Sequence, residues 1–329
     1  MIYLGKAPYR ISLLGGGSDL DWFVEKESFG ISLGYALNKY SYAVINRLPS
    51  ISSYGILNYS IRETYCDPKE ITHPLIREGI KYFKNLGLIE LSSYGFASGG
   101  SGLGGSSSFL LSLLAALHIS QSIEYSSSLL AHIASEIEIN ILSKPIGRQD
   151  QYISSEGGIN AFKFKRSGDV SKLSISREKR TVITRIIDSL YLIPSNKTRP
   201  ADKVLNSLKD NPSSIRYFKM IREIANSFIN CDEKRDAYLE EKFHESVRQS
   251  WEIKSKMTNV MDEKLKEQFA LLNKIPNNWI RLLGAGSGGY FLICPKESPE
   301  IFRQRLFDKG FNVFFKASLS NQGVSSMHF

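Results

Sequence analysis

Cysteines are rare in this sequence, and they lie far apart. Cys66, Cys231 and Cys294 form no Cys-x-x-Cys pair and have no histidine at the spacing of a metal ligand. We therefore expect neither a disulfide framework nor a zinc site.

Long apolar runs are also missing. No run approaches the ~20 residues that a helix needs to cross a bilayer. The first residues, Met1 to Lys6, lack the positive head and apolar stretch of a signal peptide. This pattern predicts a cytoplasmic protein with no membrane partner.

Internal repeats and low-complexity linkers are absent from the sequence as well. The chain has 329 residues, which exceeds the ~250 to 300 at which single hydrophobic cores usually stop growing. At 42% apolar residues it can form a sizeable core. We expect two lobes, with domains at residues 1–195 and 196–329.

The order of the expected elements predicts an α+β class. Short β-branched and aromatic runs in the first third indicate a largely antiparallel sheet, with two buried helices behind it. Beyond Pro200 the chain becomes helical and amphipathic, and its end returns to strand patterns. The main expected elements are strands at 7–14, 31–37, 40–45, 94–97, 158–164, 190–193, 290–293 and 313–315, and helices at 74–86, 109–117, 127–142 and 299–307.

The charge balance favours anionic partners. Lysine and arginine number 42 against 33 aspartates and glutamates, a formal net charge of +9. Such a surplus attracts nucleotides, sugar phosphates or nucleic acid. The basic residues are spread out, as in Arg177, Lys179 and Arg180, so a solvated surface explains them equally well. No continuous basic stripe or aromatic platform favours nucleic acid.

The most unusual segment is a glycine-serine loop at 98–108, which leads directly into an apolar run expected to be a buried helix capped by one of the serines. Glycines let the backbone approach a ligand, and a helix N-terminus attracts anions, so phosphate is the expected guest. The Walker pattern is absent. The pattern Gly-x-Gly-x-x-Gly matches at Gly100, Gly102 and Gly105 but again at Gly284, and so discriminates little. A purely structural turn remains an alternative.

Carboxylates and hydroxyls near this loop are typical of phosphoryl transfer, which needs held phosphates, a magnesium ion and a carboxylate that orients the attacking hydroxyl. Ser106 and Ser107 are candidate metal contacts. Glu138 lies on the following expected helix, and Glu136 would point away from it. Asp150 follows that helix in a polar cluster. Each carboxylate alone is more often a solvated charge.

Three ordered segments together resemble the motifs of the GHMP kinases, the superfamily of galactokinase, homoserine kinase and mevalonate kinase. They are Ala7 to Asp19 (APYRISLLGGGSD), Gly102 to Ser107 (GLGGSS) and Gly284 to Gly289 (GAGSGG). Further segments are similar to the branch that contains D-glycero-D-manno-heptose 7-phosphate kinase: Gly15 to Asp19, Ile146 to Tyr152 with Gly157 to Asn160, Trp251 to Lys254, and Arg281 to Gly286. Arg281 stands where this branch carries a lysine.

The resemblance implies a fold and an activity. The fold has two lobes, an N-terminal one similar to a ribosomal protein domain and a C-terminal ferredoxin-like α/β sandwich. The activity is an ATP- and magnesium-dependent transfer to the anomeric hydroxyl of a heptose phosphate, on the way to GDP-heptose for surface polysaccharide. The implied partners are the sugar phosphate and ATP. Whether the chain forms a homodimer is left open.

The resemblance also implies roles for individual residues. The loop Gly100, Ser101, Gly102, Leu103, Gly104, Gly105, Ser106 and Ser107 would hold the triphosphate, with Ser106 and Glu138 as magnesium ligands. Asp150 matches the catalytic aspartate, and Arg10 matches the basic residue that pairs with it. The expected substrate contacts are Gly16, Gly17, Ser18, Asp19, Gln149, Gly286, and, for the substrate's phosphate, Arg199 and Lys203.

Three classes of function remain open at this stage. The first is a small-molecule kinase for a heptose phosphate or another sugar, such as fucose or galactose. The second is a binding protein that keeps the fold but does not catalyse a reaction. The presence of Arg10, Glu138 and Asp150 together argues against such a loss of activity. The third is nucleic-acid binding.

Overall fold

Two long antiparallel strands form the backbone of the first sheet. The computed structural model describes residues 1–97, 99–198 and 201–329. Strand β1 (Ile2–Leu14) pairs with β2 (Phe29–Arg47) along most of its length. The two strands expected at 31–37 and 40–45 are thus one. The register shifts between Pro8 and Tyr9, because proline has no N–H for the ladder and β2 bulges opposite it.

The remaining strands extend this sheet on both sides. In the described chain, the sheet has eight strands in the order β12-β1-β2-β5-β3-β4, with β6 on β2 and β7 on β6. All pairs are antiparallel except β3 with β5, which confirms the largely antiparallel sheet. The bounds are β3 (Gly55–Asn58), β4 (Arg62–Tyr65), β5 (Ile89–Gly95), β6 (Ile159–Lys165), β7 (Val170–Leu173) and β12 (Ser325–His328).

Helix α3 (Gly105–Ser120) is the buried helix that the apolar run predicts. It packs so closely on β1 that a Cβ at Gly5 would overlap the carbonyl oxygen of Ser112, so only glycine fits there. The expected serine cap is wrong. The N-cap is Gly104 in the left-handed region, φ 72°, and no side chain caps the helix. The first-turn N–H groups are therefore left without a side-chain acceptor.

The other helices of the first half end at residues other than those expected from the sequence. The helix expected at 127–142 is α4 (Ser127–Ser135) followed by a π-helical turn, η2 (Glu136–Ile141). A π-turn is wider than an α-turn and rotates the residues that follow it. The remaining elements are α1 (Asp21–Glu27), a 3-10 turn η1 (Pro68–Glu70), α2 (Pro74–Lys81) and α5 (Gln149–Glu156).

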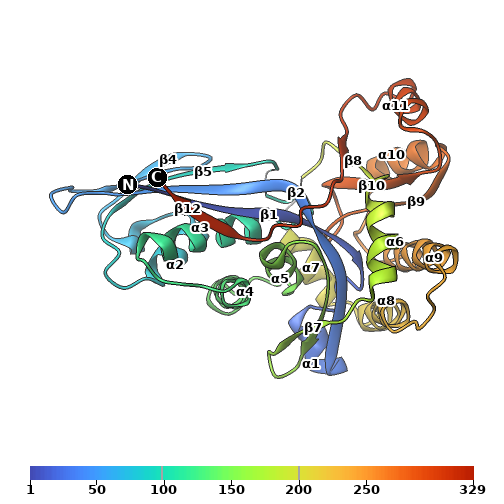
Figure 1. Cartoon of the computed structure of the whole chain (residues 1–329), viewed down its shortest axis with the longest axis horizontal. Helices are drawn as coiled ribbons and strands as arrows, with labels where there is room; N and C mark the ends of the chain where they lie inside the picture. The colour runs from blue at the N-terminus through green and yellow to red at the C-terminus, as the bar shows by residue number, and fades with distance from the viewer. Residues whose placement is uncertain (98, 199–200) are drawn as a thin grey trace.

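A second, smaller sheet carries the helical half (Figure 1). Its order is β11-β8-β10-β9, and all pairs are antiparallel. The strands are β8 (Tyr191–Pro194), β9 (Asn277–Leu282), β10 (Tyr290–Pro295) and β11 (Phe315–Lys316). The helices are α6 (Arg177–Ile187), α7 (Ala201–Lys209), α8 (Ser213–Ile229), α9 (Asp236–Ser255), α10 (Glu263–Asn273) and α11 (Pro299–Asp308). On α9, the apolar residues Leu239, Phe243, Val247 and Trp251 follow at steps of four and are all buried, in keeping with the amphipathic pattern.

One of the hydrophobic clusters spans both sheets. A single cluster joins Tyr9 and Leu33 of the first sheet to Leu192 and Leu292 of the second, with Phe243 of α9. Both termini lie at the far end of the first sheet, because β12 returns to pair with β1 (Figure 1). The division at residues 1–195 and 196–329 stays a prediction. None of the helices in the described part of the chain is long and apolar enough to cross a membrane.

Candidate active site

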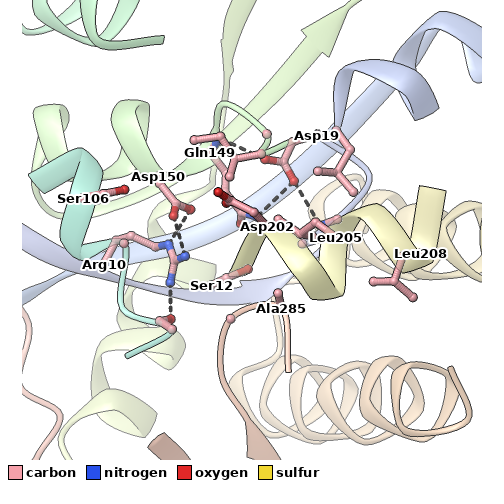
Figure 2. A pocket seen from close by; sticks show the side chains of 18 of the residues that line it. Arg10, Ser12, Asp19, Ser106, Gln149, Asp150, Asp202, Leu205, Leu208 and Ala285 are labelled. Carbon is pink, nitrogen blue, oxygen red and sulfur yellow. Dashed lines mark hydrogen bonds and ion pairs between the residues drawn. The ribbon is translucent and has the colours of Figure 1, made fainter. Parts of the chain in front are cut away.

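A cavity of about 250 Å³ lies where segments from both halves of the chain meet. The loop after β1, the glycine-serine loop and the start of α5 line it from the first half, and α7, α9, β9 and the loop at 284–285 line it from the second. Figure 2 shows Arg10, Asp150 and Ser106 grouped together, with Asp19 and Gln149 across the space and α7 along one side.

An arginine–aspartate pair joins two segments that are 140 residues apart in the sequence. Arg10 Nε donates to Asp150 Oδ1 at 2.7 Å, and Nη2 donates to Oδ2 at 2.7 Å. The third nitrogen, Nη1, donates to the carbonyl oxygen of Gly102 at 2.6 Å. This bidentate geometry fixes the carboxylate in one orientation. One arginine therefore holds both the aspartate and the glycine-serine loop.

The glycine-serine loop lies directly against this pair. A Cβ at Gly104 would be 3.0 Å from Arg10 Cγ and 3.3 Å from Asp150 Oδ2. Gly100, Gly102 and Gly104 all have positive φ, between 72° and 77°, which other residues rarely adopt. The loop ends at the uncapped N-terminus of α3, whose dipole and free N–H groups favour an anion. Loop and aspartate thus face the same space.

Glu138 is fully buried behind this loop. It accepts hydrogen bonds from Ser106 Oγ at 2.7 Å and Ser107 Oγ at 2.6 Å. Gln151 Nε2 donates to it at 2.7 Å, and Lys144 Nζ pairs with it at 3.0 Å. Ser106 lines the cavity, whereas Ser107 and Glu138 do not. The π-turn therefore places a carboxylate under the start of α3, linked to the cavity through Ser106.

Asp19 forms the opposite wall of the cavity. Its carboxylate accepts from the backbone N–H of Gly17 and from the backbone and side-chain N–H groups of Gln149, each at 3.0 Å. Burial nevertheless raises the pKa of Asp19 to about 6, because desolvation outweighs these hydrogen bonds, and the nearby Asp150 adds to the rise.

Two buried cations line the cavity from the second half of the chain. Lys254 of α9 donates to the carbonyl of Gly284 at 2.5 Å, and Arg281 of β9 donates to the carbonyl of Leu13 at 2.5 Å. Burial, with the nearby Arg281 and Arg10, lowers the pKa of Lys254 to about 7. Burial and Arg10 lower the pKa of Arg281 to about 10. The surroundings of both side chains therefore disfavour the protonated, charged form.

The structure brings together most of the residues expected from the sequence. Arg10, Asp150, Asp19, Gln149, Gly16 and Gly17 line the cavity, as do Gly100, Ser101, Gly102, Gly104, Gly105 and Ser106.

Other expected contacts lie elsewhere. Leu103 is buried and takes part through its carbonyl, which accepts from the N–H of Arg10. Ser18 is buried and bonds Gly15 and Ile31. Lys203 is exposed and does not line the cavity, and neither does Gly286. Arg199 lies outside the described residues.

Sequence reasoning missed several lining residues. Lys254 and Arg281 fall within quoted motifs, and Lys254 continues the buried face of α9 three residues after Trp251, but neither was assigned to the site. Ser12 also lies in a quoted motif without having been assigned to the site, and Lys144 lies outside the quoted motifs. Asp202 and Phe218 come from helices for which no role was expected.

The comparison with known families finds a match in the first half of the chain. Residues 75–158, which contain the glycine-serine loop, Glu138 and Asp150, match the GHMP kinases N terminal domain. Over these residues the chain is similar to the GHMP kinases. The match, together with the kinases described below, supports a phosphotransferase with ATP as its phosphoryl donor.

Known kinases resemble the chain over nearly its whole length. A D-glycero-alpha-D-manno-heptose 7-phosphate kinase from Campylobacter jejuni is 24% identical over 339 aligned residues, covering 98% of this chain and 97% of the relative. The crystal structure of a D-glycero-D-manno-heptose 1-phosphate kinase from Bacteroides thetaiotaomicron has a TM-score of 0.75 at 19% identity and covers 99% of both chains. Galactokinase from Lactococcus lactis, complexed with galactose, has a TM-score of 0.73 at 13% identity, covering 100% of this chain and 95% of its own. These likenesses confirm the two-lobed fold.

Proposed function

We propose that this protein is a GHMP kinase that transfers the γ-phosphate of ATP to the anomeric hydroxyl of D-glycero-D-manno-heptose 7-phosphate. The product would be the 1,7-bisphosphate, a precursor of GDP-heptose for surface polysaccharide. The relative from Campylobacter jejuni supports the choice of sugar phosphate, because it aligns with nearly the whole chain.

The observation that carries the proposal is the position of Asp150. Arg10 fixes its carboxylate beside Gly104, and both face one cavity with Asp19 and Gln149 on the other wall. A triphosphate in the glycine-serine loop and a sugar against Asp19 would therefore meet at Asp150. Holding two reactants in attack geometry is worth up to ~7 to 11 kcal/mol of the barrier, and positioning together with charge stabilisation supplies most of the catalysis in phosphoryl transfer.

In this arrangement each residue has a defined task. The α3 N-terminus and the loop glycines hold the β- and γ-phosphates through backbone N–H groups. The anomeric oxygen attacks the γ-phosphorus, the bond to the β-phosphate oxygen breaks, and ADP leaves. Asp150 accepts a hydrogen bond from the attacking hydroxyl and takes its proton as the new P–O bond forms. Arg10 stabilises the charge on the transferring group.

Magnesium fits the donor set behind the loop. Ser106 Oγ and Glu138 Oε1 are 2.7 Å apart, and both are the hard oxygen ligands that Mg²⁺ prefers. No cluster of three or more acidic, histidine or cysteine side chains that could hold a metal unaided occurs among the described residues, so phosphate oxygens would complete the shell. We assign Ser106 and Glu138 to this ion, which when bound neutralises charge on the β- and γ-phosphates.

The experiment is ADP release from a panel of acceptors: D-glycero-D-manno-heptose 7-phosphate, fucose, galactose and mevalonate, each with ATP and Mg²⁺. We expect turnover with the heptose phosphate. Asp150→Asn should lose at least ~10²-fold in kcat and still bind ATP, because the amide cannot accept the proton. The exposed Asp188→Asn, on the far end of α6, serves as a matched control with wild-type rates.

Each other outcome points to another function. Turnover with fucose or galactose instead of the heptose phosphate would make the protein a different anomeric sugar kinase. ATP binding without turnover of any acceptor would support a silent binding protein. Tight, salt-dependent RNA association would support the nucleic-acid alternative.

A further inference from the structure

Several buried polar atoms on one wall of the cavity have no partner. Arg281 Nε and Ser12 Oγ, from side chains that are 5% and 6% exposed, form no hydrogen bond with any described residue. Leaving such a donor unsatisfied costs about 1 to 3 kcal/mol, and more for a charged group. A cost of this kind at a cavity wall points to a ligand that supplies the acceptors.

The same wall has an excess of positive charge. Among the described residues, no carboxylate forms an ion pair with Lys254 or Arg281, whose side-chain bonds go to the carbonyls of Gly284 and Leu13. Arg10, by contrast, is paired with Asp150. Burial and mutual repulsion disfavour the charges of Lys254 and Arg281, and a bound dianion would offset both effects.

Arg281 and Ser12 lie beside the segment that carries Gly16, and Lys254 lies near enough to Arg10, Asp19 and Asp150 to feel the charge of each. Arg281 Nη1 bonds the carbonyl of Leu13, the residue that follows Ser12. Ser12 Oγ is only 2.6 Å from where a Cβ of Gly16 would be, and Gln149 Oε1, also without a partner, is 3.4 Å from the same point. Gly16 and Gln149 belong to the wall that carries Asp19, whereas the triphosphate loop lies with Arg10 and Asp150.

We propose that Arg281, Ser12 and Lys254 form an anion subsite that binds the acceptor's own phosphate monoester and so selects a phosphorylated sugar over the free sugar. This inference rests on the proposed function and names the residues that read its substrate. Two cations and a hydroxyl suit a phosphate, which offers two charges and three free oxygens, better than they suit a carboxylate, which offers one charge and two oxygens. The subsite replaces exposed Lys203 in that role.

The kinetic test compares D-glycero-D-manno-heptose 7-phosphate with unphosphorylated D-glycero-D-manno-heptose. Arg281→Met should raise KM for the phosphorylated acceptor by roughly 10- to 100-fold and leave KM for the free sugar and for ATP nearly unchanged. Ser12→Ala should do the same more weakly, and Arg281→Lys should restore part of the preference. Exposed Arg303→Met on α11 is the matched control. If the variants raised KM equally for the phosphorylated and the free sugar, the proposal would be overturned. These residues would then be assigned to the phosphoryl group that is transferred.

A binding test separates this inference from the choice of sugar. Inorganic phosphate is titrated calorimetrically into protein saturated with Mg²⁺ and a non-hydrolysable ATP analogue, so that the triphosphate loop is filled. We expect binding that Arg281→Met and Ser12→Ala weaken, at unchanged melting temperature for Ser12→Ala. Unaltered phosphate affinity in both variants would refute the subsite, even if the enzyme phosphorylates the heptose phosphate. Conversely, if another sugar is the acceptor, the proposed function fails while this titration still judges the subsite.

Discussion

Asp19 and Lys254 show how burial sets the charge of individual residues in this cavity. Both side chains are nearly inaccessible, and both have a pKa that burial moves toward neutrality, Asp19 upward to about 6 and Lys254 downward to about 7. Between about pH 4 and 6, the folded protein therefore holds a proton at Asp19 that the unfolded chain has lost. Between about pH 7 and 10.5, it has lost a proton at Lys254 that the unfolded chain retains.

These shifts predict opposite effects of pH on stability. Because the raised pKa of Asp19 favours the protonated folded state, its contribution falls as pH rises from about 4 to 6. The lowered pKa of Lys254 makes stability rise with pH between about 7 and 10.5. Lys254→Met should therefore be most stabilising, relative to wild type, below pH 7, and this difference should shrink toward pH 10. Thermal unfolding across pH measures it, with exposed Lys256→Met as control. A difference that does not vary with pH would contradict the shift.

Glu138 gives a second prediction for a single residue. Glu138→Gln removes the charge that pairs with Lys144. It also places a side-chain NH₂ group where the carboxylate accepted hydrogen bonds from Ser107 and Lys144. The Mg²⁺ concentration for half-maximal activity should rise roughly tenfold or more, because a carboxylate ligand is lost. Metal titrations of the kinase rate measure this. The control is Glu136→Gln, two positions earlier and outside the cavity; an equal response from both variants would remove Glu138 from the metal site.

At the scale of an element, the start of α3 depends on the backbone of Gly104. Gly104→Ala would place a methyl group in the left-handed region and 3.3 Å from Asp150 Oδ2. We expect roughly 1 kcal/mol of destabilisation from the backbone and a loss in kcat/KM from crowding of the aspartate. Gly87→Ala is the matched control, since Gly87 has nearly the same φ, +74°, and open space around it. If both variants lose stability and activity equally, Gly104 has no special role in the site.

The sequence predicted element types better than it predicted element ends. Alternation and apolar runs located the strands and the buried helix, because those patterns are local. The π-turn at 136–141 has no local pattern that distinguishes it from an α-helix, so the sequence predicts an ordinary helix there. The N-cap is Gly104, which has no side chain to cap with, although several serines follow it in the sequence.

The same division applies to the site. Arg10 and Asp150 were found because they lie in recognisable motifs, and the structure places them in contact. Lys144, Ser12 and the unpaired state of Arg281 depend on which segments meet in three dimensions. Single polar residues on strands and loops carry no spacing that predicts such a meeting.

At the scale of the whole molecule, the shared core predicts how the protein unfolds. The cluster that joins β1 and β2 to β8, β10 and α9 leaves no boundary across which the halves could separate without exposing apolar surface. Calorimetry should therefore show one cooperative transition, which an ATP analogue shifts upward by an amount that grows with the logarithm of one plus the ratio of the analogue's concentration to its Kd. Two separate transitions, only one of them moved by the analogue, would show that residues 1–195 and 196–329 unfold independently.

The two glycine loops, one from each half, touch through their backbones. A Cβ on Gly284 would be 2.5 Å from the Cα of Gly102, and one on Gly102 would be 2.7 Å from the carbonyl oxygen of Leu283. The two loops therefore pack backbone against backbone, with no side chain between them. A ligand that fixed the loop at 100–105 would also restrain the segment that leads from Gly284 back to Arg281 on β9.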